Sequence, residues 1–592
     1  MSDTPPHKGL RAALFLIMTV CMAVLPLQSA SNNLRWSLVR VAPAGDQTAR
    51  LLYGLGFEHL HPVSEGFELV ADRAALESIR DLGLDALVID SDYGRTVAER
   101  NDWATSLAGE GEFATGSMGG YFSPNEILAF VDSLREVVGD SVIGDTSVIG
   151  TSLLGRPVWM VEVSGGGGGN NAPEVFFNSL THPREGMSGM SLLYFLQFLA
   201  NNYASVDSVR WLVDNRRIFC VPLVNPDGYE INFDTYKNEN RFGYWRKNAR
   251  DNNGDGDNND FEDGVDLNRN FGYKWGIDDS GSSSDWYSES FRGDSAFSEP
   301  ESRVIRELVA GREFRVAVNC HAYGNYMLKP WSYAPAETPD SVTFNRLGAL
   351  LTARSGYRHG NATTTLDYTA NGEFTDWEYG DTLGGRIIAW TAEIGESYLG
   401  FWPPSTEIEP IAGKMLSTFF AAARAAGFWP GLEFEGTDSV PGHSRRQTIR
   451  FRVVNHGLGL ANGSFTVKPV AARAGSKIIR SEYIDSTASL PAAGSVIIEF
   501  PPEVYSMAVE LVVEQDGLTV TSLPLTLVRT GSDVSADLDL NGRTDIFDLL
   551  ALLRTISGGV PDGEELSRYD LNEDGELNVF DLLDLLQRLK NR

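Results

Sequence analysis

The sequence is poor in cysteine, in basic residues and in long apolar runs. Only three of its 592 residues are cysteine, and 49 Lys plus Arg stand against 80 Asp plus Glu, which gives a formal net charge of −31. This charge disfavours nucleic acid and anionic lipid as partners. Beyond residue 25 no run is long and apolar enough to span a bilayer, so we expect no membrane span in the mature chain.

The one marked apolar run predicts a signal peptide. Basic residues precede the run 12–25, and small residues follow it. These are the features of a secretory signal, with cleavage expected after Ala30 or Ser31. A membrane anchor is the alternative, but the run is too short to span comfortably. We therefore expect a secreted, extracellular protein, with attachment to a cell surface as an option.

Two cysteines lie beyond the signal peptide, Cys220 and Cys320. Both stand in apolar, strand-like runs, so we expect two buried free thiols. A disulfide between neighbouring strands is the alternative that the sequence leaves open.

Changes of pattern predict four regions after the signal peptide at 1–31. Strands and helices alternate in a small α+β unit that, with its linker, is placed at 32–112. The stretch 109–120 is rich in Gly, Ser and Ala and predicts a linker. Strands and helices alternate again over 113–429, which predicts one α/β domain. Short strands without amphipathic helices predict a β-sandwich over 430–531. Residues 532–592 hold an internal repeat with apolar helices.

A histidine and a glutamate in the α/β region carry the first sign of chemistry. His182 and Glu185 follow the apolar run 175–180, so their loop opens where a core strand ends, as sites in open α/β sheets do. Both residues can bind one zinc ion, and catalytic zinc has three protein ligands and one open position. His321 follows the strand-like run 315–320 and completes a two-His, one-Glu set. The alternative for His321 is a hydrogen-bonded core imidazole.

Hydrolysis at such a site needs a base that takes a proton from water. Glu393 ends the apolar run 387–392, where a carboxylate is costly to bury unless it has a partner or a role. Glu396 is the competing candidate.

Eight motifs are spread through nearly the whole α/β region. They are THPRE at 181–185, NPDGYE at 225–230, YWRKN at 244–248, GVDLNRNF at 264–271, FRGDSAFSEPE at 291–301, NCHAYG at 319–324, LDYTANGEFTDW at 366–377 and TAEIG at 391–395. In this order they resemble the zinc carboxypeptidases of the A, B and T type. The resemblance implies a mixed central sheet flanked by helices, one catalytic Zn²⁺, and hydrolysis of C-terminal residues from peptides and proteins.

The resemblance also implies roles for single residues. His182, Glu185 and His321 match the zinc ligands. Glu393 matches the general base, and its distance from the following Gly-Phe-Trp-Pro-Pro segment favours it over Glu396.

The substrate contacts are implied in the same way. Arg246 matches the arginine that polarises the scissile carbonyl and holds the oxyanion, and Arg184 matches an auxiliary subsite arginine. Asn268 and Arg269 match the pair that grips the terminal carboxylate, and Tyr368 matches the mobile tyrosine that covers the terminal residue. A planar guanidinium suits both tasks, because it offers a bidentate fork and a fixed charge. Outside this context these residues would be read as solvated surface groups.

The preferred terminal residue is less well defined. Thr375 aligns with the base of the side-chain pocket, where relatives specific for basic residues carry an acid. Glu373 lies two residues earlier and could still reach a basic side chain. We expect broad specificity, with acceptance of Lys and Arg through Glu373.

A stretch between Arg246 and Asn268 fits the twelve-residue calcium loop. An ion there could brace the substrate clamp; the alternative is a solvated Asp/Asn loop, because no helix clearly flanks it. Its candidate ligands are Asp251, Asn253, Asp255, Asn259 and Glu262.

The C-terminal repeat is a stronger calcium signal, with two loops 33 residues apart. It resembles a dockerin, which implies two Ca²⁺ ions and a cohesin-like partner. The residues before the twelfth loop position, Ile546-Phe547 and Val579-Phe580, are apolar instead of polar, which leaves a role in the core or against an internal neighbour as the alternative. The candidate ligands are Asp537, Asp539, Asn541, Arg543 (through its carbonyl), Asp545 and Asp548, and Asp570, Asn572, Asp574, Glu576 (through its carbonyl), Asn578 and Asp581.

Three alternatives remain for the whole chain. The N-terminal unit resembles the pro-segment of zinc carboxypeptidases in position and pattern, but it could be a permanent accessory domain. The enzyme could be a cell-wall peptide amidase or endopeptidase of the same fold, although the Asn268–Arg269 pair and Tyr368 favour recognition of a free carboxylate. An inactive surface-attachment protein is disfavoured because all three zinc ligands and Glu393 are present.

Overall fold

The computed structural model describes most of the chain from residue 35 onward, so the predicted signal peptide lies outside the described residues. No helix in the described ranges is long and apolar enough to cross a membrane. The ranges are 35–57, 60–107, 113–144, 146–167, 169–381, 386–435, 439–441, 446–460, 465–471, 478–480, 482–484, 491–499, 506–515, 517–530, 536–539, 544–558, 569–571 and 576–590.

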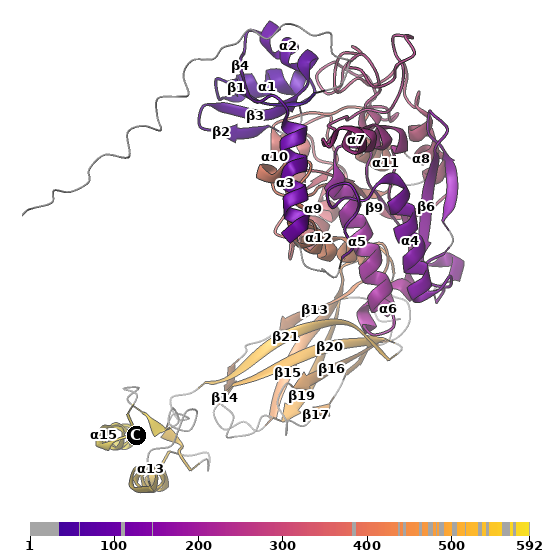
Figure 1. Ribbon diagram of the computed structural model, residues 1–592. Coiled ribbons are helices and arrows are strands. Elements are labelled where there is room, and N and C mark those ends of the chain that lie inside the picture. The colour runs from indigo at the N-terminus through magenta and orange to yellow at the C-terminus, as the bar shows by residue number, and fades with distance from the viewer. Residues whose placement is uncertain are drawn as a thin grey trace, which may run out of the picture.

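The N-terminal region is a small antiparallel sheet of order β2-β3-β1-β4 with two helices (Figure 1). Val39 and Val41 of β1 are fully buried in its core. The side chain of Asp72 accepts a hydrogen bond from the amide of Ala75 at 2.8 Å and so caps the second helix. The elements are β1 Ser37–Ala42, α1 Asp46–Gly54, β2 His61–Val63, β3 Gly66–Ala71, α2 Arg73–Asp81 and β4 Asp85–Asp90.

A helix that the sequence did not predict, α3 Tyr93–Leu107, connects this region to the central one. Beside its start, Arg241 of the central region donates to both oxygens of Asp92, at 2.7 and 2.8 Å. The linker prediction over 109–120 was wrong where the chain is described, because Met118 is fully buried. Gly116 is needed there for close backbone approach, since a Cβ would lie 2.1 Å from the carbonyl oxygen of Tyr121.

The central region is built on an eight-stranded sheet of order β11-β10-β12-β9-β7-β8-β6-β5. β8, β7, β9 and β12 run parallel, whereas β6 and β10 pair with them antiparallel, which confirms the predicted mixed sheet. The strands are β5 Ser147–Thr151, β6 Pro157–Val163, β7 Glu174–Asn178, β8 Arg217–Val221, β9 Phe314–His321, β10 Tyr326–Lys329, β11 Arg358–Asn361 and β12 Ile388–Glu393.

Helices cover both faces of this sheet. Val175 and Phe177 of β7 pack into the core shared with α4, α5, α9 and α12, and Phe176 packs into the opposite core with α8 and α11. Burial on both faces explains why the strands are continuously apolar. The helices are α4 Pro124–Val138, α5 Gly186–Asn202, α6 Asp207–Asn215, α7 Pro226–Glu239, α8 Pro300–Ala310, α9 Ser341–Thr352, α10 Ala362–Leu366, α11 Phe374–Gly380 and α12 Ser405–Ala425.

The third histidine of this region, His359, lies on edge strand β11, away from His182 and His321. The prediction for the cysteines was right: Cys220 and Cys320 are buried free thiols. They stand on β8 and β9, and β7 separates these strands, so a disulfide between neighbouring strands does not arise.

Two sheets follow, with the orders β13-β15-β19-β17 and β14-β21-β20-β16-β18. They share one core, in which Phe451 and Ile498 of the first sheet join Val467 and Leu511 of the second, as expected of a β-sandwich. The strands are β13 Pro430–Glu435, β14 Ser439–Pro441, β15 Arg446–Asn455, β16 Phe465–Ala471, β17 Ile478–Arg480, β18 Glu482–Ile484, β19 Ala492–Glu499, β20 Ser506–Gln515 and β21 Leu518–Thr530.

The C-terminal region contributes two helices, α13 Ile546–Gly558 and α15 Val579–Lys590. Leu552 of the first helix and Leu585 of the second are fully buried in one small core.

Arg216 fixes the chain segment that leads from the central region into the sandwich, whose core includes the side chain of Phe428. The side chain of Arg216 is 3% exposed and donates to the carbonyl oxygens of Ala423 at 3.0 Å, Arg424 at 2.9 Å and Phe428 at 2.7 Å. The first two are carbonyls of the last turn of α12, which have no partner within the helix, and a cation is favourable there.

We expect Arg216→Ala to destabilise the protein by about 3 kcal/mol, because several buried carbonyls would lose a charged donor. Thermal melting would report the loss. Arg452→Ala is the control, since Arg452 is 44% exposed in its ion pair with Glu433, and its melting temperature should stay close to that of the wild type. Equal melting of all three proteins would contradict this account of the interface.

Candidate active site

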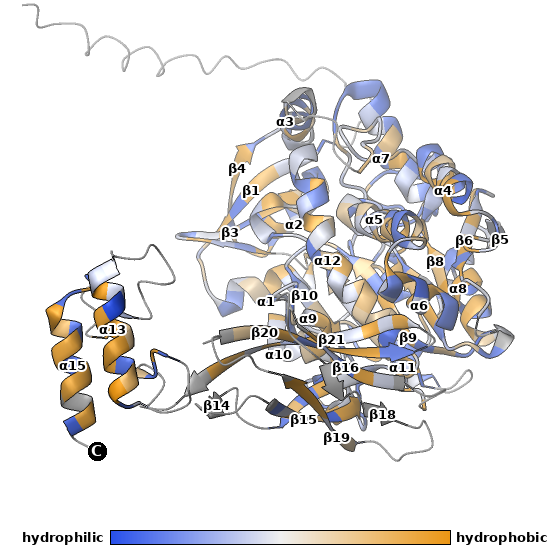
Figure 2. Ribbon diagram, turned by 90° about the horizontal axis from the view of Figure 1, so that it is seen from below, coloured by the Kyte–Doolittle hydropathy of each residue, from blue (hydrophilic) through white to orange (hydrophobic). Residues whose placement is uncertain are grey.

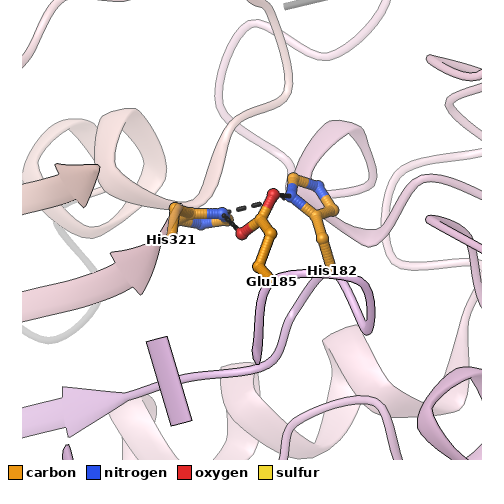
Figure 3. A group of neighbouring side chains, drawn as sticks. All are labelled: His182, Glu185 and His321. Atoms are coloured by element: carbon orange, nitrogen blue, oxygen red, sulfur yellow. Dashed lines mark hydrogen bonds and ion pairs between the residues drawn. The ribbon is translucent and has the colours of Figure 1, made fainter. Parts of the chain in front are cut away.

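The three predicted zinc ligands converge at one edge of the central sheet (Figure 3). His182 lies in the loop after β7, Glu185 is the N-cap of α5, and His321 is the last residue of β9. The Glu185 oxygens lie 2.7 Å from Nδ1 of His182 and 2.9 Å from Nδ1 of His321, and the two nitrogens are 3.1 Å apart. Adjacent parallel strands end at the same edge, which explains the convergence.

This donor set fits a zinc ion. Two imidazole nitrogens and a carboxylate, all buried, lie within 4.8 Å of one another. Zinc accepts both ligand types, and three protein ligands leave one position open. Burial raises the pKa of Glu185, but the two imidazoles lower it more strongly, so the carboxylate stays ionised as a ligand must be.

Asp266 connects this centre to a buried arginine, and the sequence reading did not single it out. One oxygen of Asp266 lies 3.0 Å from Nε2 of His182, and the other accepts bonds from Arg246 at 2.8 and 3.1 Å. Burial raises the pKa of Asp266, but the charges of Arg246, His182 and Arg269 bring it well below its ordinary value. Asp266 therefore orients one ligand and forms an ion pair that stabilises the buried charge of Arg246. In the sequence, only the position of Asp266 within the GVDLNRNF motif could have pointed to this role.

Asn268 and Arg269 lie in a short 3₁₀ turn, Leu267–Arg269, beside the tyrosine predicted to cover the substrate. The guanidinium of Arg269 is buried and donates to the backbone carbonyl of Asn268 at 2.7 Å and to the hydroxyl of Tyr368. The side-chain oxygen of Asn268 accepts the amide of Phe374 at 3.0 Å, which fixes its orientation.

The two candidate bases have different surroundings. Glu393 ends β12, is 7% exposed and pairs in register with His321 of β9. Glu396 forms an ion pair with Lys414 at 3.0 Å near the surface. Only Glu393 therefore stands beside the ligands.

A cavity of about 380 Å³, including its opening to solvent, brings several of these groups together. Thr375 is not among the residues that line it; its hydroxyl bonds with the side chains of Asn319 at 2.8 Å and Thr391 at 2.6 Å. Arg184 is paired with Glu289 at 2.7 Å. The lining includes Asn268, His321, Tyr368, Glu373, Thr391 and Glu393.

The inserted loop at 251–262 is held by its own hydrogen bonds. Asp251 accepts the amides of Gly254 at 2.6 Å and Gly256 at 3.0 Å, and Asn253 donates to Glu262 at 3.0 Å. Among the residues that the structure describes, its carboxylates do not form a group as close as the zinc-type one. The structure thus adds no support for a calcium ion here.

The C-terminal loops do gather acidic groups. Asp537, Asp539 and Asp548 place carboxylate oxygens within 4.8 Å of one another. In the second loop Asp581 accepts the amides of Leu571 at 2.7 Å and Asn578 at 2.8 Å. The predicted ligands outside the described residues are Asn541, Arg543, Asn572 and Asp574.

Comparison with known proteins identifies the two domains. Residues 130–418 match the zinc carboxypeptidase family model. The central domain belongs to the zinc carboxypeptidase family. Residues 535–590 match the dockerin type I domain, so the C-terminal region is a dockerin domain.

Relatives of known sequence agree with this assignment. Carboxypeptidase A1 of Rattus norvegicus is 29% identical over 300 residues, which are 49% of this chain and 67% of that protein. Carboxypeptidase B of Astacus astacus is 29% identical over 303 residues, 49% and 91% of the two chains. The zinc carboxypeptidase of Saccharothrix mutabilis subsp. capreolus is 28% identical over 381 residues, 58% and 84% of the two chains.

Solved structures show the same fold. The carboxypeptidase A from Helicoverpa armigera matches with a TM-score of 0.55 and 22% identity, over 67% of this chain and 98% of that one. The thrombin activatable fibrinolysis inhibitor matches with a TM-score of 0.52 and 20% identity, over 66% and 98%. The predicted carboxypeptidase-like fold is thereby confirmed.

We expect Asp266→Asn to weaken zinc binding by about 10- to 100-fold, because His182 would lose the carboxylate that orients it. Competition with a zinc-binding dye would measure the change. Asp263→Asn is the matched control: Asp263 is equally buried but accepts backbone amides of the inserted loop. Wild-type zinc affinity in Asp266→Asn would rule out the orienting role.

Proposed function

We propose that this chain is a secreted zinc carboxypeptidase that removes C-terminal residues from peptides and proteins. The observation that carries the proposal is a single cavity lined by the predicted zinc ligand His321, the buried Glu393, and both Asn268 and Tyr368. Such a combination favours cleavage next to a free carboxylate.

The proposed chemistry assigns one task to each group. His182, Glu185 and His321 would hold zinc, which supplies Lewis-acid polarisation of water and of the scissile carbonyl. Glu393 takes the proton from the attacking water and passes it to the leaving amine. Arg246, beside His182 at 3.4 Å, supplies a fixed positive charge for the developing oxyanion.

Arg269 and its neighbours would select chain ends. The guanidinium already binds the Tyr368 hydroxyl, and an incoming carboxylate offers two stronger acceptors. Asn268 adds a neutral donor next to it, and Tyr368 then closes over the bound residue. An amidated end lacks the negative charge, so it should bind poorly. Arg184 and Thr375 would act at most indirectly on the substrate, through Glu289 and Thr391.

The first test compares blocked dipeptides that differ only in a free or an amidated C-terminus. We expect cleavage of the free form alone, its loss with a zinc chelator, and its return with added zinc. Cleavage of both forms at similar rates would favour the cell-wall amidase or endopeptidase alternative. A chain that binds zinc and cleaves neither would favour an inactive attachment protein.

We expect Glu393→Gln to lower kcat by about 10²- to 10⁴-fold without loss of zinc, because the proton acceptor is removed. Glu396→Gln is the matched control and should retain wild-type rates, since Glu396 pairs with Lys414 away from the cavity. Steady-state kinetics of the wild type and both variants on one peptide would measure the change in kcat. The reverse ranking of the two variants would make Glu396 the base.

We also propose the domain boundaries that the sequence predicts. They are a signal peptide at 1–31, a pro-segment-like domain at 32–112, the catalytic domain at 113–429 and a β-sandwich at 430–531. The pro-segment role is supported by Tyr53 of α1, whose ring lies 5.5 Å from that of Tyr368, and by Arg50, 3.9 Å from Asp367. Mass spectrometry of the secreted form would separate a removed pro-segment, which starts the chain near 113, from a permanent domain, which starts it near 32.

The dockerin domain would attach the enzyme to a partner. Ile546 and Phe547 are 57% and 59% exposed, and Val579 and Phe580 are 55% and 60% exposed, so they do not belong to a core. Figure 2 shows apolar residues along both helices. The alternatives of a core role or an internal neighbour therefore lose support among the described residues, and a cohesin-like partner with an apolar face fits better.

Calcium should hold this domain together, because its acidic loops otherwise crowd like charges. At constant zinc, removal of calcium is expected to abolish partner binding and to lower helical circular dichroism, while cleavage of small peptides continues. Asp548→Ala should reproduce the loss of binding in the presence of calcium. Loss of peptidase activity on calcium removal would instead favour a calcium ion in the inserted loop at 251–262 that braces the substrate clamp.

A further inference from the structure

Glu373 is a buried acid, and only one of its two carboxylate oxygens has a hydrogen-bond partner among the described residues. It is 5% exposed and lies at the N-cap of α11, where its side chain makes no capping bond. One oxygen accepts a bond from the Thr391 hydroxyl at 2.9 Å, and the other is buried without a hydrogen-bond partner among the described residues. A buried carboxylate oxygen in this state is costly, so its presence calls for a partner that arrives from outside.

The unused oxygen belongs to a residue that lines the cavity, together with Asn268 and Tyr368 of the proposed carboxylate clamp. No ion pair is formed by Glu373 within the described part of the chain. The remaining wall contains Leu328, Ala362 and other apolar groups. A long aliphatic stem with a cation at its end suits such a wall, because the stem buries apolar surface and the charge reaches the acid.

Two more acids stand behind Glu373 on α11, but neither competes for such a cation. Asp376 accepts the amides of Ser332 at 2.9 Å and Tyr333 at 3.2 Å, and Glu378 accepts the amide of Asn319 at 2.7 Å. Burial, together with the charge of Glu373, raises the pKa of Glu378 to about 8. Glu378 also has one oxygen, Oε1, without a hydrogen-bond partner among the described residues, but neither Asp376 nor Glu378 lines the cavity. Glu373 is therefore the acid of this group that can reach a ligand in the cavity.

We propose that the cavity takes the side chain of a C-terminal Lys or Arg and that Glu373 Oε2 pairs with its cation. The assignment rests on the proposed carboxypeptidase function and narrows the broad specificity expected from the sequence. It keeps Glu373, which the sequence predicts to accept a basic side chain, as the specificity determinant; the Thr375 hydroxyl is already bonded. A terminal Phe would leave the carboxylate oxygen unpaired, which sites with buried polar groups discriminate against strongly.

The test uses four blocked dipeptides that differ only in the last residue: Arg, Lys, Phe and Leu. The wild type should cleave the basic pair with a kcat/KM at least about tenfold above that of the apolar pair. Glu373→Gln should lose at least about tenfold on Arg and Lys while Phe and Leu stay within about threefold. Glu378→Gln is the control; it removes a neighbouring acid that does not line the cavity, so the preference should persist.

The outcomes separate this assignment from the function on which it rests. If the wild type cleaves Phe and Leu as well as Arg and Lys, or if Glu373→Gln lowers all four alike, the Glu373 assignment is wrong and the carboxypeptidase stands. If none of the four is cleaved by zinc-loaded enzyme, the proposed function itself fails. Should Glu373→Gln not fold, product inhibition of the wild type decides: free arginine must inhibit at least about tenfold more strongly than free phenylalanine.

Discussion

The arrangement depends above all on the parallel pairing of β9 with β7 on one side and with β12 on the other. This pairing brings three strand ends to one edge of the sheet, so that the loop after β7, the end of β9 and the end of β12 meet. His182, His321 and Glu393 come from segments far apart in the sequence, and no local interaction could bring them together. The continuous burial of these strands between two helical layers then holds the edge rigid, as a site for hydrolysis requires.

Such an edge collects charge, and around the predicted zinc ligands the buried charges lie next to charges of opposite sign. Asp266 is the centre of this balance: it faces His182 on one side and Arg246 on the other, and its charge is held by both. A lone guanidinium at the position of Arg246 would be prohibitively costly to bury, whereas the pair costs far less. Glu373 is the acid of the cavity that this balance leaves out, and the same reasoning that explains Asp266 assigns it a ligand.

The sequence was informative wherever a residue's surroundings follow from its own segment. Apolar runs located the strands of the central sheet, and motif context located His182, Glu185 and His321, because strand ends in α/β folds are natural sites. It failed where a contact comes from elsewhere. The bonds of the Thr375 hydroxyl to Asn319 and Thr391, and the bridge from Asp266 to Arg246, join distant segments and carry no local sequence signal. α3 carries no clear periodic signal, and the Gly-rich stretch after it looked like a linker although tertiary contacts bury part of it.

The two accessory regions on either side of the catalytic domain contact opposite ends of its parallel strands. Tyr53 of the N-terminal region reaches Tyr368 at the cavity, where the strands end. The sandwich is held through the last turn of α12, where Arg424 donates to the carbonyl oxygen of Val520 in β21 at 2.9 Å. Arg216, which directly precedes β8, holds that turn where the strands begin. The proposed attachment through the sandwich and the dockerin domain thus lies at the start of the strands, whereas the N-terminal region contacts the cavity edge. The proposed anchoring and the proposed control of access would therefore act on different edges of one sheet.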